Sequence, residues 1–578
     1  MSDHSESTGP GGSVARFEAR VQIPAVEKVP LIPNIKARGN GALGYLGERF
    51  ARSVARAVVT PTEALLLHGT PPASQEDYLF GRKGPWPQPS PSHPLGQAPA
   101  VVHLPFSYKL DWQLNIGMRY LATLMFWWPV AAAKTAETPA LAEVPDDEFD
   151  RLMTTGIYSK FLTPFSFTDE PAGPEQVVSQ GPVDNAPDSS TGDVLDPRKV
   201  FSAFAPANGE GKYYVVDLTP IKGVRPYRGM YVAPTLSLVR KDARNQPGRV
   251  IAIYINDMVL TPKDGAAWRL SKYFVLQGAS YGILFTIHPN IHFPYDPINA
   301  ITISALPKQH LLSRLLQPHL RFSLALDDAV LQSPASVISN YRLTPYDPFT
   351  ARMNDGLAAF FNAGYAGIPG NPAYPPYTYT MRPKDFASDY STFLSAYYPA
   401  FQTFVAKVLS PENLPVGDRY VTRWARYINE WIPSFPNGDE IWEQDRLVDA
   451  VAGFLWGVSV AHAADHQVFA KVIKPSQYCL RLRLPPPSSA TMPDFDRRDL
   501  STPIDLFKAV LATKMFFEPT NITLLCDTRY DFDADVEPQL IAAQNQFLQD
   551  LRDVEASLKE SGIPIYIPLD EISRSIQY

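Results

Sequence analysis

The sequence predicts a mainly α-helical protein with a large core and only small β excursions. Apolar residues recur at helical spacing through much of the second half of the chain. These segments are residues 268–292, 419–431, 446–469, 504–517 and 537–560. β-branched and aromatic residues gather in two runs, 212–218 and 250–260, which predict strands. A hydrophobic share of 45% and a charged share of 19% are typical of a globular protein with a large core.

The overall charge argues against a nucleic-acid-binding protein. The chain has 52 Lys and Arg against 59 Asp and Glu, a net charge of −7, and no basic run. Its two cysteines, Cys479 and Cys526, cannot form a disulfide framework, and their spacing fits no zinc motif. The 57 prolines predict long irregular connections and broken helices. The polar N-terminus lacks the order of charged and apolar residues found in a signal peptide, so we expect a cytoplasmic protein.

We expect three regions along the chain. Residues 1–20 are polar and predict a disordered tail. Residues 21–143 are expected to be an N-terminal extension packed on the main domain, residues 144–578. Within that domain, residues 176–197 predict a polar loop and residues 564–578 an extended tail.

One segment of the N-terminal extension is apolar enough to suggest a membrane span. Residues 114–133 contain Asn115 and Arg119 and are interrupted by Pro129, which favours a buried helix. Peripheral contact with a membrane surface is the alternative. A proline-rich stretch before it, residues 84–105, predicts an extended conformation on the surface.

Histidine is scarce, with ten residues in the chain, and four of them form two pairs spaced four residues apart. The pairs are His288 with His292 and His462 with His466. Residues at this spacing share one face of a helix, so two packed helices would bring four imidazoles around one metal ion. A single pair of this kind is usually a chance occurrence, but two pairs in apolar surroundings favour a metal site. Imidazole suits Fe, Zn, Cu and Ni, so the ligand type does not name the metal.

Five segments resemble the catalytic domain of lipoxygenases, in the family's order and at similar spacing. VPDDEFDRLMTTG resembles LPxDEEFxRQxLAG, and WRLSKYFVLQGASYGILFTIHPNIH resembles WxLAKxYVxxxDxxxHQLxxHxxxTH. HLLSRLLQPHLRFSLALDDAV is similar to HPxxxLLxPHxRYTLxINxLA. LVDAVAGFLWGVSVAHAADHQVF resembles LxxFLTxIIFTxSAxHAAVNFGQ, and YIPLDEISRSIQY resembles YxYLxPxxIPNSIxI. The resemblance covers residues 144–578 and implies a lipoxygenase-like helical catalytic domain. The family's N-terminal PLAT β-barrel is not evident, as in bacterial members.

The resemblance implies a set of metal ligands. His288, His292 and His462 fall on the family's iron-binding histidines, and His466 on a position that holds asparagine or histidine. Tyr578 takes the place of the terminal isoleucine, whose main-chain carboxylate binds the metal. His310 and His319 match family histidines that are not ligands, and we expect them to form core hydrogen bonds. We expect Asp465, turned away from the ligand face, to be structural or to support a ligand.

The first histidine pair departs from the usual family spacing. Most members place these two ligands one residue farther apart, which needs a π-bulge, whereas the spacing of His288 and His292 is what a regular helix supplies. This shorter spacing resembles the manganese lipoxygenases of fungi, so iron is expected with manganese as the alternative. Pro289, between the two ligands, removes one backbone donor and predicts a kink.

The resemblance also implies an apolar substrate pocket. Leu284 and Phe469 replace two glutamines that connect the ligand helices to the pocket in many members. Val330 falls where the family usually has Ala or Gly, a position that directs O2. The uncharged run 450–460, which contains Phe454 and Leu455, predicts a pocket wall.

The implied activity is that of a non-haem dioxygenase acting on polyunsaturated fatty acids and O2. A metal-bound hydroxide, and no side chain, would accept a bis-allylic hydrogen, and O2 would add to give a hydroperoxide. The metal must change oxidation state, which excludes zinc. One alternative is the same fold and metal acting on another apolar substrate, and a second is a homologue with a binding role. A membrane di-iron hydroxylase would need more histidines and true spans. We expect a monomer.

Overall fold

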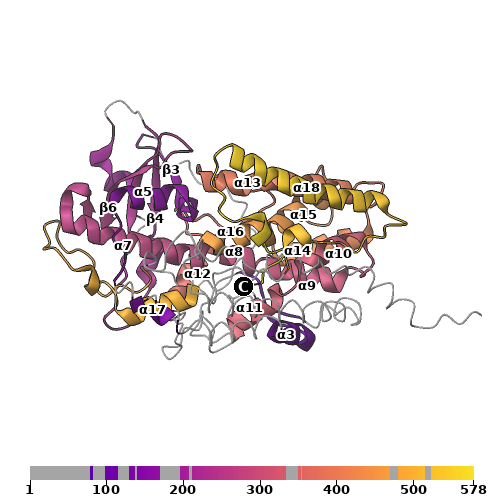
Figure 1. The fold of residues 1–578 in the computed structure, drawn as a ribbon, viewed down its shortest axis with the longest axis horizontal. Coiled ribbons are helices and arrows are strands. Elements are labelled where there is room, and N and C mark those ends of the chain that lie inside the picture. Colours follow the sequence, from indigo (N-terminus) through magenta and orange to yellow (C-terminus); the bar gives the residue numbers. More distant parts are fainter. Residues whose placement is uncertain are drawn as a thin grey trace, which may run out of the picture.

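The computed structural model describes most of the chain from residue 78 onward (Figure 1). The described residues are 78–81, 98–114, 129, 131–133, 135, 136, 140–168, 195–206, 211–332, 349–352, 355–468, 479–513 and 523–577. The expected tail at residues 1–20, the loop at 176–194 and most of the apolar segment 114–133 lie outside them. Phe469 and Tyr578 also lie outside the described residues.

The prediction of a mainly α-helical architecture is confirmed. The α-helices are α3 (Phe106–Trp112), α5 (Asp146–Thr155), α6 (Pro197–Val200), α7 (Gly265–Gly282), α8 (Pro289–His292), α9 (Tyr295–Ala305), α10 (Leu311–Leu316), α11 (Ser323–Gln332), α12 (Leu357–Tyr365), α13 (Asp389–Val408), α14 (Arg419–Trp431), α15 (Arg446–Trp456), α16 (His462–Gln467), α17 (Pro503–Ala512) and α18 (Pro538–Glu560). Shorter 3₁₀ turns connect them, including Ile157–Phe161 directly after α5 and Leu569–Glu571 in the C-terminal tail. All five segments predicted to be helical are helical where the structure describes them.

A small antiparallel sheet lies at one end of the molecule (Figure 1). Its strands, in spatial order, are β3 (Thr163–Phe165), β4 (Tyr213–Asp217), β5 (Leu236–Arg240), β6 (Arg249–Ile255) and β7 (Met258–Leu260). The run 250–260 forms strands, as predicted, but it is divided into two, β6 and β7. Asn256 and Asp257 adopt positive φ values of 48° and 59°, so the chain turns there and makes a two-residue hairpin.

Helix α5 fixes the sheet to the helical part of the protein. Its first turn carries three acidic residues, where they suit the helix dipole. Asp150 accepts a hydrogen bond from the backbone N–H of Val250 at 2.8 Å, and the buried Lys272 of α7 contacts Asp146 at 2.6 Å. The sheet, α5 and the start of α7 therefore form one packed unit.

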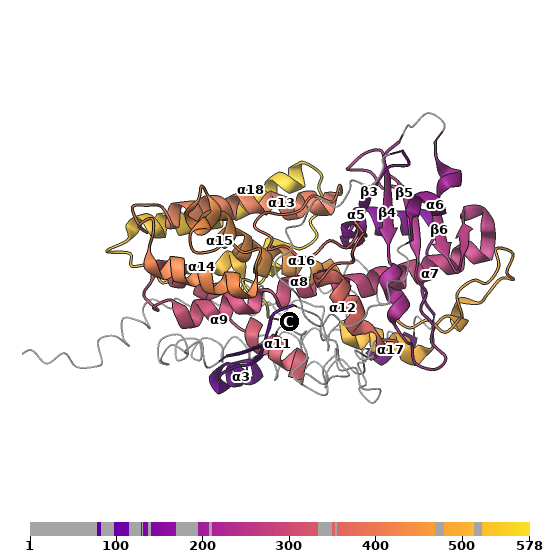
Figure 2. The ribbon, with the colours of Figure 1, turned by 180° about the vertical axis from the view of Figure 1, so that it is seen from behind.

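Two long helical segments cross at the centre of the molecule and carry the site (Figure 2). One runs through α7 and α8 and the other through α15 and α16, and each contains a π-helical turn, Ile283–Ile287 and Gly457–Ala461 respectively. Around them, α13 packs against α15 and α18, and α14 packs against α9. These contacts enclose the central segments in a single large apolar core.

The second central segment, Arg446–Gln467, is also long and apolar enough to cross a membrane. However, 94% of the apolar 18-residue stretch within this segment is buried inside the protein. Burial in the core therefore accounts for its composition.

A second, two-stranded sheet and helix α3 come from the N-terminal extension. Strands β1 (Leu79–Gly81) and β2 (Ala100–His103) pair antiparallel. Val101 and Leu104 pack against Ala300 of α9 and Leu324 of α11 in a small apolar cluster. This part of the extension therefore rests on helices next to the site.

Candidate metal centre

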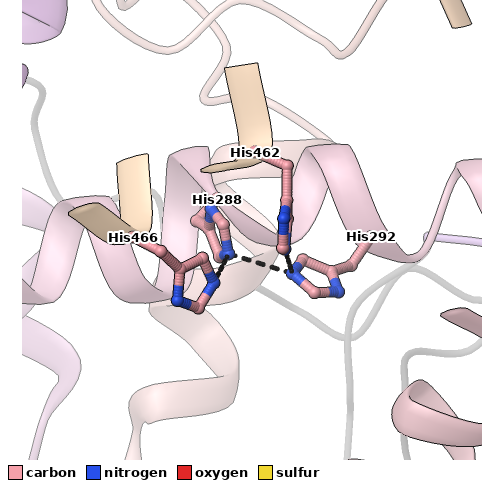
Figure 3. A group of neighbouring side chains, drawn as sticks. All are labelled: His288, His292, His462 and His466. Atoms are coloured by element: carbon pink, nitrogen blue, oxygen red, sulfur yellow. Dashed lines mark hydrogen bonds between the residues drawn. The ribbon is translucent and has the colours of Figure 1, made fainter. Parts of the chain in front are cut away.

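The structure brings together all four histidines that the sequence singles out (Figure 3). His288 and His292 come from the first central segment and His462 and His466 from the second, and their rings point toward one another. One ring nitrogen of each lies within 4.8 Å of the corresponding nitrogens of the other three. His462 is fully buried, and the other three are nearly so.

The Nε2 atoms are spaced as ligands of one ion would be. Nε2 of His292 lies 2.9 Å from Nε2 of His288 and 3.0 Å from Nε2 of His462, and the two Nε2 atoms of His288 and His466 are 2.7 Å apart. Two nitrogens that bind one ion at right angles, each about 2.1 Å from it, are about 3 Å apart. The Nε2 atom of His292 has a single lone pair, so it cannot satisfy two neighbouring donors at once. A cation between the rings would satisfy all four.

The π-helical turns directly precede the first histidine of each pair. The backbone N–H of His288 donates to the carbonyl of Ile283 at 2.9 Å, one residue farther back than in an α-helix. From His288 to His292 the chain is α-helical, as the spacing predicts. The expectation of a regular helix is therefore correct between the two histidines, whereas the π-turn before them was not predicted.

Pro289 supplies the physical reason for the first π-turn. Its ring would clash with the carbonyl four residues earlier in a regular helix, and it has no N–H to donate. A wider turn relieves the clash without breaking the helix. The Asn290 side chain then donates to the Thr286 carbonyl at 3.1 Å and to the Gly364 carbonyl at 2.8 Å, which ties the turn to α12.

His292 is oriented by a buried carboxylate. Its Nδ1 atom lies 2.8 Å from Oδ1 of Asp327 on α11. A carboxylate there favours the tautomer with the proton on Nδ1, which leaves the Nε2 lone pair facing the cluster. Behind Asp327 lies Asp296, whose pKa burial and the neighbouring Asp327 raise well above the ordinary range. The backbone N–H of Val101 on β2 donates to Asp296 at 3.4 Å.

His288 contacts a second carboxylate, that of Asp465. Nδ1 of His288 lies 3.6 Å from Oδ2 of Asp465. Lys160 donates to both carboxylate oxygens at 2.6 and 2.8 Å, and the Tyr390 hydroxyl donates at 2.7 Å. The expectation that Asp465 turns away from the ligand face is correct, and from its own side of α16 it approaches the outer nitrogen of a histidine on the other helix.

Burial and charge set the protonation of this pair. Burial lowers the pKa of His288 to about 4, so the ring is neutral near pH 7 and its Nε2 lone pair is free to bind a cation. Burial alone would raise the pKa of Asp465, but Lys160 and the contact with His288 outweigh it and hold the pKa at about 2. Asp465 is therefore ionised.

The remaining predicted residues fall into three groups. Phe454 and Leu455 are buried on α15, and Val330 on α11 and Leu284 in the π-turn are half-buried against the same core. Phe469 and Tyr578 lie outside the described residues. His310 caps α10 and contacts Asp418 at 3.2 Å, whereas His319 donates to the Arg574 carbonyl and accepts from Tyr530. These two histidines thus form core hydrogen bonds, as expected.

A cavity of about 310 Å³ lies near the Asp465 side of α16. Val468, Ile157 and Tyr566 are among its lining residues, and its lining does not include Val330, Leu284, Phe454 or Leu455. The Tyr566 ring packs edge-on against Tyr390, 4.7 Å between centroids. The cavity therefore lies next to Tyr390, which bonds to Asp465, and the four predicted pocket residues that the structure describes do not line it.

Sequence reasoning missed three side chains at this site: Asp327, Lys160 and Tyr390. The acidic pair at 327–328 was a usable signal, because the pattern that this segment resembles has asparagine and a variable residue at these two positions. Nothing near Lys160 or Tyr390 indicates that either reaches Asp465.

The C-terminal tail is tied to the ligand helices. Gln467 donates to Glu571 at 2.9 Å, directly after the second histidine pair. The backbone N–H of Leu525 donates to the Ile572 carbonyl, and Ile576 and Gln577 are fully buried. The end of the tail, from Glu571 to Gln577, is thus buried except for the half-buried Arg574.

Comparisons with known proteins give no sequence relative but a clear structural likeness. No protein-family model matches the sequence, and no curated protein sequence matches it. Solved structures do match. The manganese lipoxygenase of Gaeumannomyces graminis is 14% identical with a TM-score of 0.63, over 91% of this chain and 98% of that one.

Other lipoxygenases match over similar lengths. Coral 8R-lipoxygenase is 15% identical with a TM-score of 0.59, over 87% of this chain and 80% of that one. A lipoxygenase variant crystallised anaerobically with arachidonate is 14% identical with a TM-score of 0.60, over 91% of this chain and 81% of that one. The protein therefore has a lipoxygenase-like fold, as the five sequence segments imply.

Proposed function

We propose that this protein is a metal-dependent dioxygenase that converts a polyunsaturated fatty acid and O2 to a hydroperoxide. One observation carries the proposal: four imidazoles from two crossing helices converge at the centre of a lipoxygenase-like fold. The imidazole rings are buried, and the ring of His288 is neutral near pH 7. Such a donor set suits a redox-active first-row ion.

His288, His292, His462 and His466 would hold the metal, and the main-chain carboxylate of Tyr578 is the proposed fifth ligand. When bound, the metal supplies the one-electron oxidation that removes a bis-allylic hydrogen atom. Iron is the proposed metal and manganese the alternative. The regular helical spacing of the first pair and the likeness to a manganese lipoxygenase both support testing manganese.

The chain's own residues would bind, orient and exclude water. Asp327 holds the proton on Nδ1 of His292 and so directs Nε2 inward. The apolar side chains of Phe454 and Leu455 keep the surrounding core dry, which protects a radical from side reactions. No described side chain is assigned as the hydrogen acceptor.

The substrate class rests on the apolar core and on likeness. A structural neighbour was crystallised with arachidonate, which supports a fatty acid here. A different apolar substrate is the alternative, because Leu284 and Val330 are larger or less polar than the residues that the sequence pattern leads us to expect. A screen of O2 uptake against fatty acids and other apolar dienes separates the two.

Metal analysis combined with an oxygen-electrode assay tests the proposal. We expect about one Fe or Mn per chain and O2 uptake with linoleate or arachidonate. His292→Ala and His462→Ala should each lose the metal and the activity, whereas His310→Gln, which changes a capping histidine, should keep both. Zinc as the bound metal, or no O2 uptake by metal-loaded protein, would count decisively against a dioxygenase.

A further inference from the structure

We propose that Asp465 is a positioning residue for His288 and that Lys160 and Tyr390 hold its charge in place beside the metal. The inference rests on the proposed metal site and adds to it a charged group that the lipoxygenase pattern does not contain. Where that pattern reads HAAVN, this chain reads HAADH, so a carboxylate stands in place of valine between the last two ligands. This chain therefore has a carboxylate that can orient one metal ligand, at a position where the pattern has an apolar side chain.

A buried carboxylate at this position needs partners. Its side chain is 1% exposed and that of Lys160 is 11% exposed, so the two charges are removed from water together. Leaving either one alone would cost several kcal/mol, whereas a paired and hydrogen-bonded group is tolerated. The Tyr390 hydroxyl supplies the further bond that satisfies the carboxylate.

Three consecutive residues, Tyr158 to Lys160, hold Lys160 next to Asp465. They belong to the 3₁₀ turn Ile157–Phe161, and each of the three side chains forms a hydrogen bond with a different helix. Tyr158 bonds to Ser280 of α7 at 2.7 Å, Ser159 bonds to Ser388 at the start of α13 at 2.7 Å, and Lys160 bonds to Asp465 of α16.

Close packing holds the same turn against the first ligand helix. The Phe161 ring lies so near Gly282 that any β-carbon at that position would overlap it. The turn is therefore fixed on both sides, and Lys160 has little freedom to leave Asp465.

The contact with His288 determines what this group does. Nδ1 of His288 is buried without a hydrogen bond, and the Asp465 carboxylate lies 3.6 Å from it. A small approach would make this carboxylate its acceptor, which favours the tautomer that keeps Nε2 free for the metal and increases the electron donation of the ring. The Lys160 ammonium cancels most of the added negative charge, so the site gains orientation without a large change in net charge. Removing Lys160 should leave an uncompensated carboxylate, which favours the higher oxidation state of a bound metal.

The test compares metal binding by matched variants of the full chain. Mn(II) affinity is measured by EPR titration of the metal-free protein, and the midpoint potential is measured on the iron-loaded protein. We expect Asp465→Asn to weaken Mn(II) binding about 10- to 100-fold. We expect Lys160→Met to lower the midpoint potential relative to wild type, provided the protein stays folded.

Asp449 gives a matched control on the same helical segment. It is also a buried carboxylate, and it accepts from Arg382 at 2.9 Å and from the Tyr398 hydroxyl at 3.1 Å, but it contacts none of the histidines that the structure describes. Asp449→Asn should lower the unfolding temperature without changing Mn(II) affinity. An equal loss of affinity in both variants would reduce Asp465 to a structural role and overturn the inference.

A double variant covers the case in which single variants unfold. Lys160→Met with Asp465→Val replaces the ion pair by apolar side chains, a change that is often neutral for stability. The inference requires weaker Mn(II) binding by this folded variant, and binding equal to wild type overturns it while the proposed function stands. If wild-type protein binds neither Mn(II) nor Fe(II), both the proposed function and this inference are wrong.

Discussion

His292 and Asp327 form a buried hydrogen bond between the first ligand helix and α11, with 2.8 Å between Nδ1 and Oδ1. They are 35 residues apart in sequence, and the Asp327 side chain is 1% exposed. The bond fixes which nitrogen of His292 carries the proton. Helix α11 contributes no histidine to the cluster, but through this bond it helps to set the orientation of one.

Replacing Asp327 should therefore weaken the metal site. We expect Asp327→Leu to reduce Mn(II) affinity about 10- to 100-fold, because the His292 ring loses the acceptor that holds its tautomer. Asp327→Asn, whose amide oxygen can still accept, should lose less. The adjacent Asp328 contacts Lys109 at 3.1 Å, so Asp328→Asn is the control and should bind Mn(II) normally. Wild-type affinity in Asp327→Leu would show that the bond does not orient the ligand.

Gly364 allows α12 to approach the first π-turn, and adding a methyl group there should disturb the site. A β-carbon at Gly364 would overlap backbone atoms of Thr286, which cannot move aside as a flexible side chain would. We expect Gly364→Ala to destabilise the fold by about 1–3 kcal/mol and to weaken Mn(II) binding. Gly156→Ala meets no atom within 4 Å and should do neither. Urea unfolding and EPR titration of both variants check this, and equal stability of the two would contradict it.

The four histidines could be predicted because their information is local. The spacing of each pair places both rings on one helix face, and the apolar sequence around them indicates two buried helices. The contact between Lys160 and Asp465 could not be predicted, since the two residues are 305 positions apart and only tertiary packing joins them. Asp465 itself was noticed, but its partners were not.

The π-turns and the hairpin were missed for a different reason. Apolar residues continue at nearly the same period through a single π-turn, so periodicity does not reveal it. The run at 250–260 contains only a short turn at Asn256 and Asp257, and strand-forming residues surround it on both sides. In both cases the irregular backbone covers only a few residues, whereas the regular sequence pattern around it extends over many.

The C-terminal tail offers a test of the proposed Tyr578 ligand. Because Gln577 is buried and its side chain bonds to Thr523, residues added after Tyr578 would have to pass through packed protein. We expect a Gly-Ser extension at the C-terminus to lower metal content and O2 uptake, and the same extension at the N-terminus to leave both unchanged. Full metal content and activity in the C-terminally extended protein would reject Tyr578 as a ligand.

His319 should make the tail sensitive to acid. It donates from Nδ1 to the Arg574 carbonyl at 2.7 Å and accepts from the Tyr530 hydroxyl at 2.9 Å, and burial lowers its pKa to about 3. An unfolded histidine has a pKa of about 6.5, so between these values the unfolded chain binds a proton that the native protein excludes. The unfolding free energy should therefore fall as pH drops from about 6.5 toward 3, by up to about 1.4 kcal/mol per pH unit from this group.

Asp150 acts in the opposite direction over part of this range, so a comparison of variants is needed. Burial raises its pKa to about 6, and the native protein then binds a proton that an unfolded carboxylate, with a pKa of about 4, releases. Subtracting the pH profile of His319→Gln from that of the wild type removes this and every other shared contribution. Urea unfolding of metal-free protein from pH 7 to pH 4 should give a wild-type profile steeper than that of His319→Gln by nearly one proton. Parallel profiles would mean that His319 is protonated in the native protein, in conflict with its two hydrogen bonds to the tail and to Tyr530.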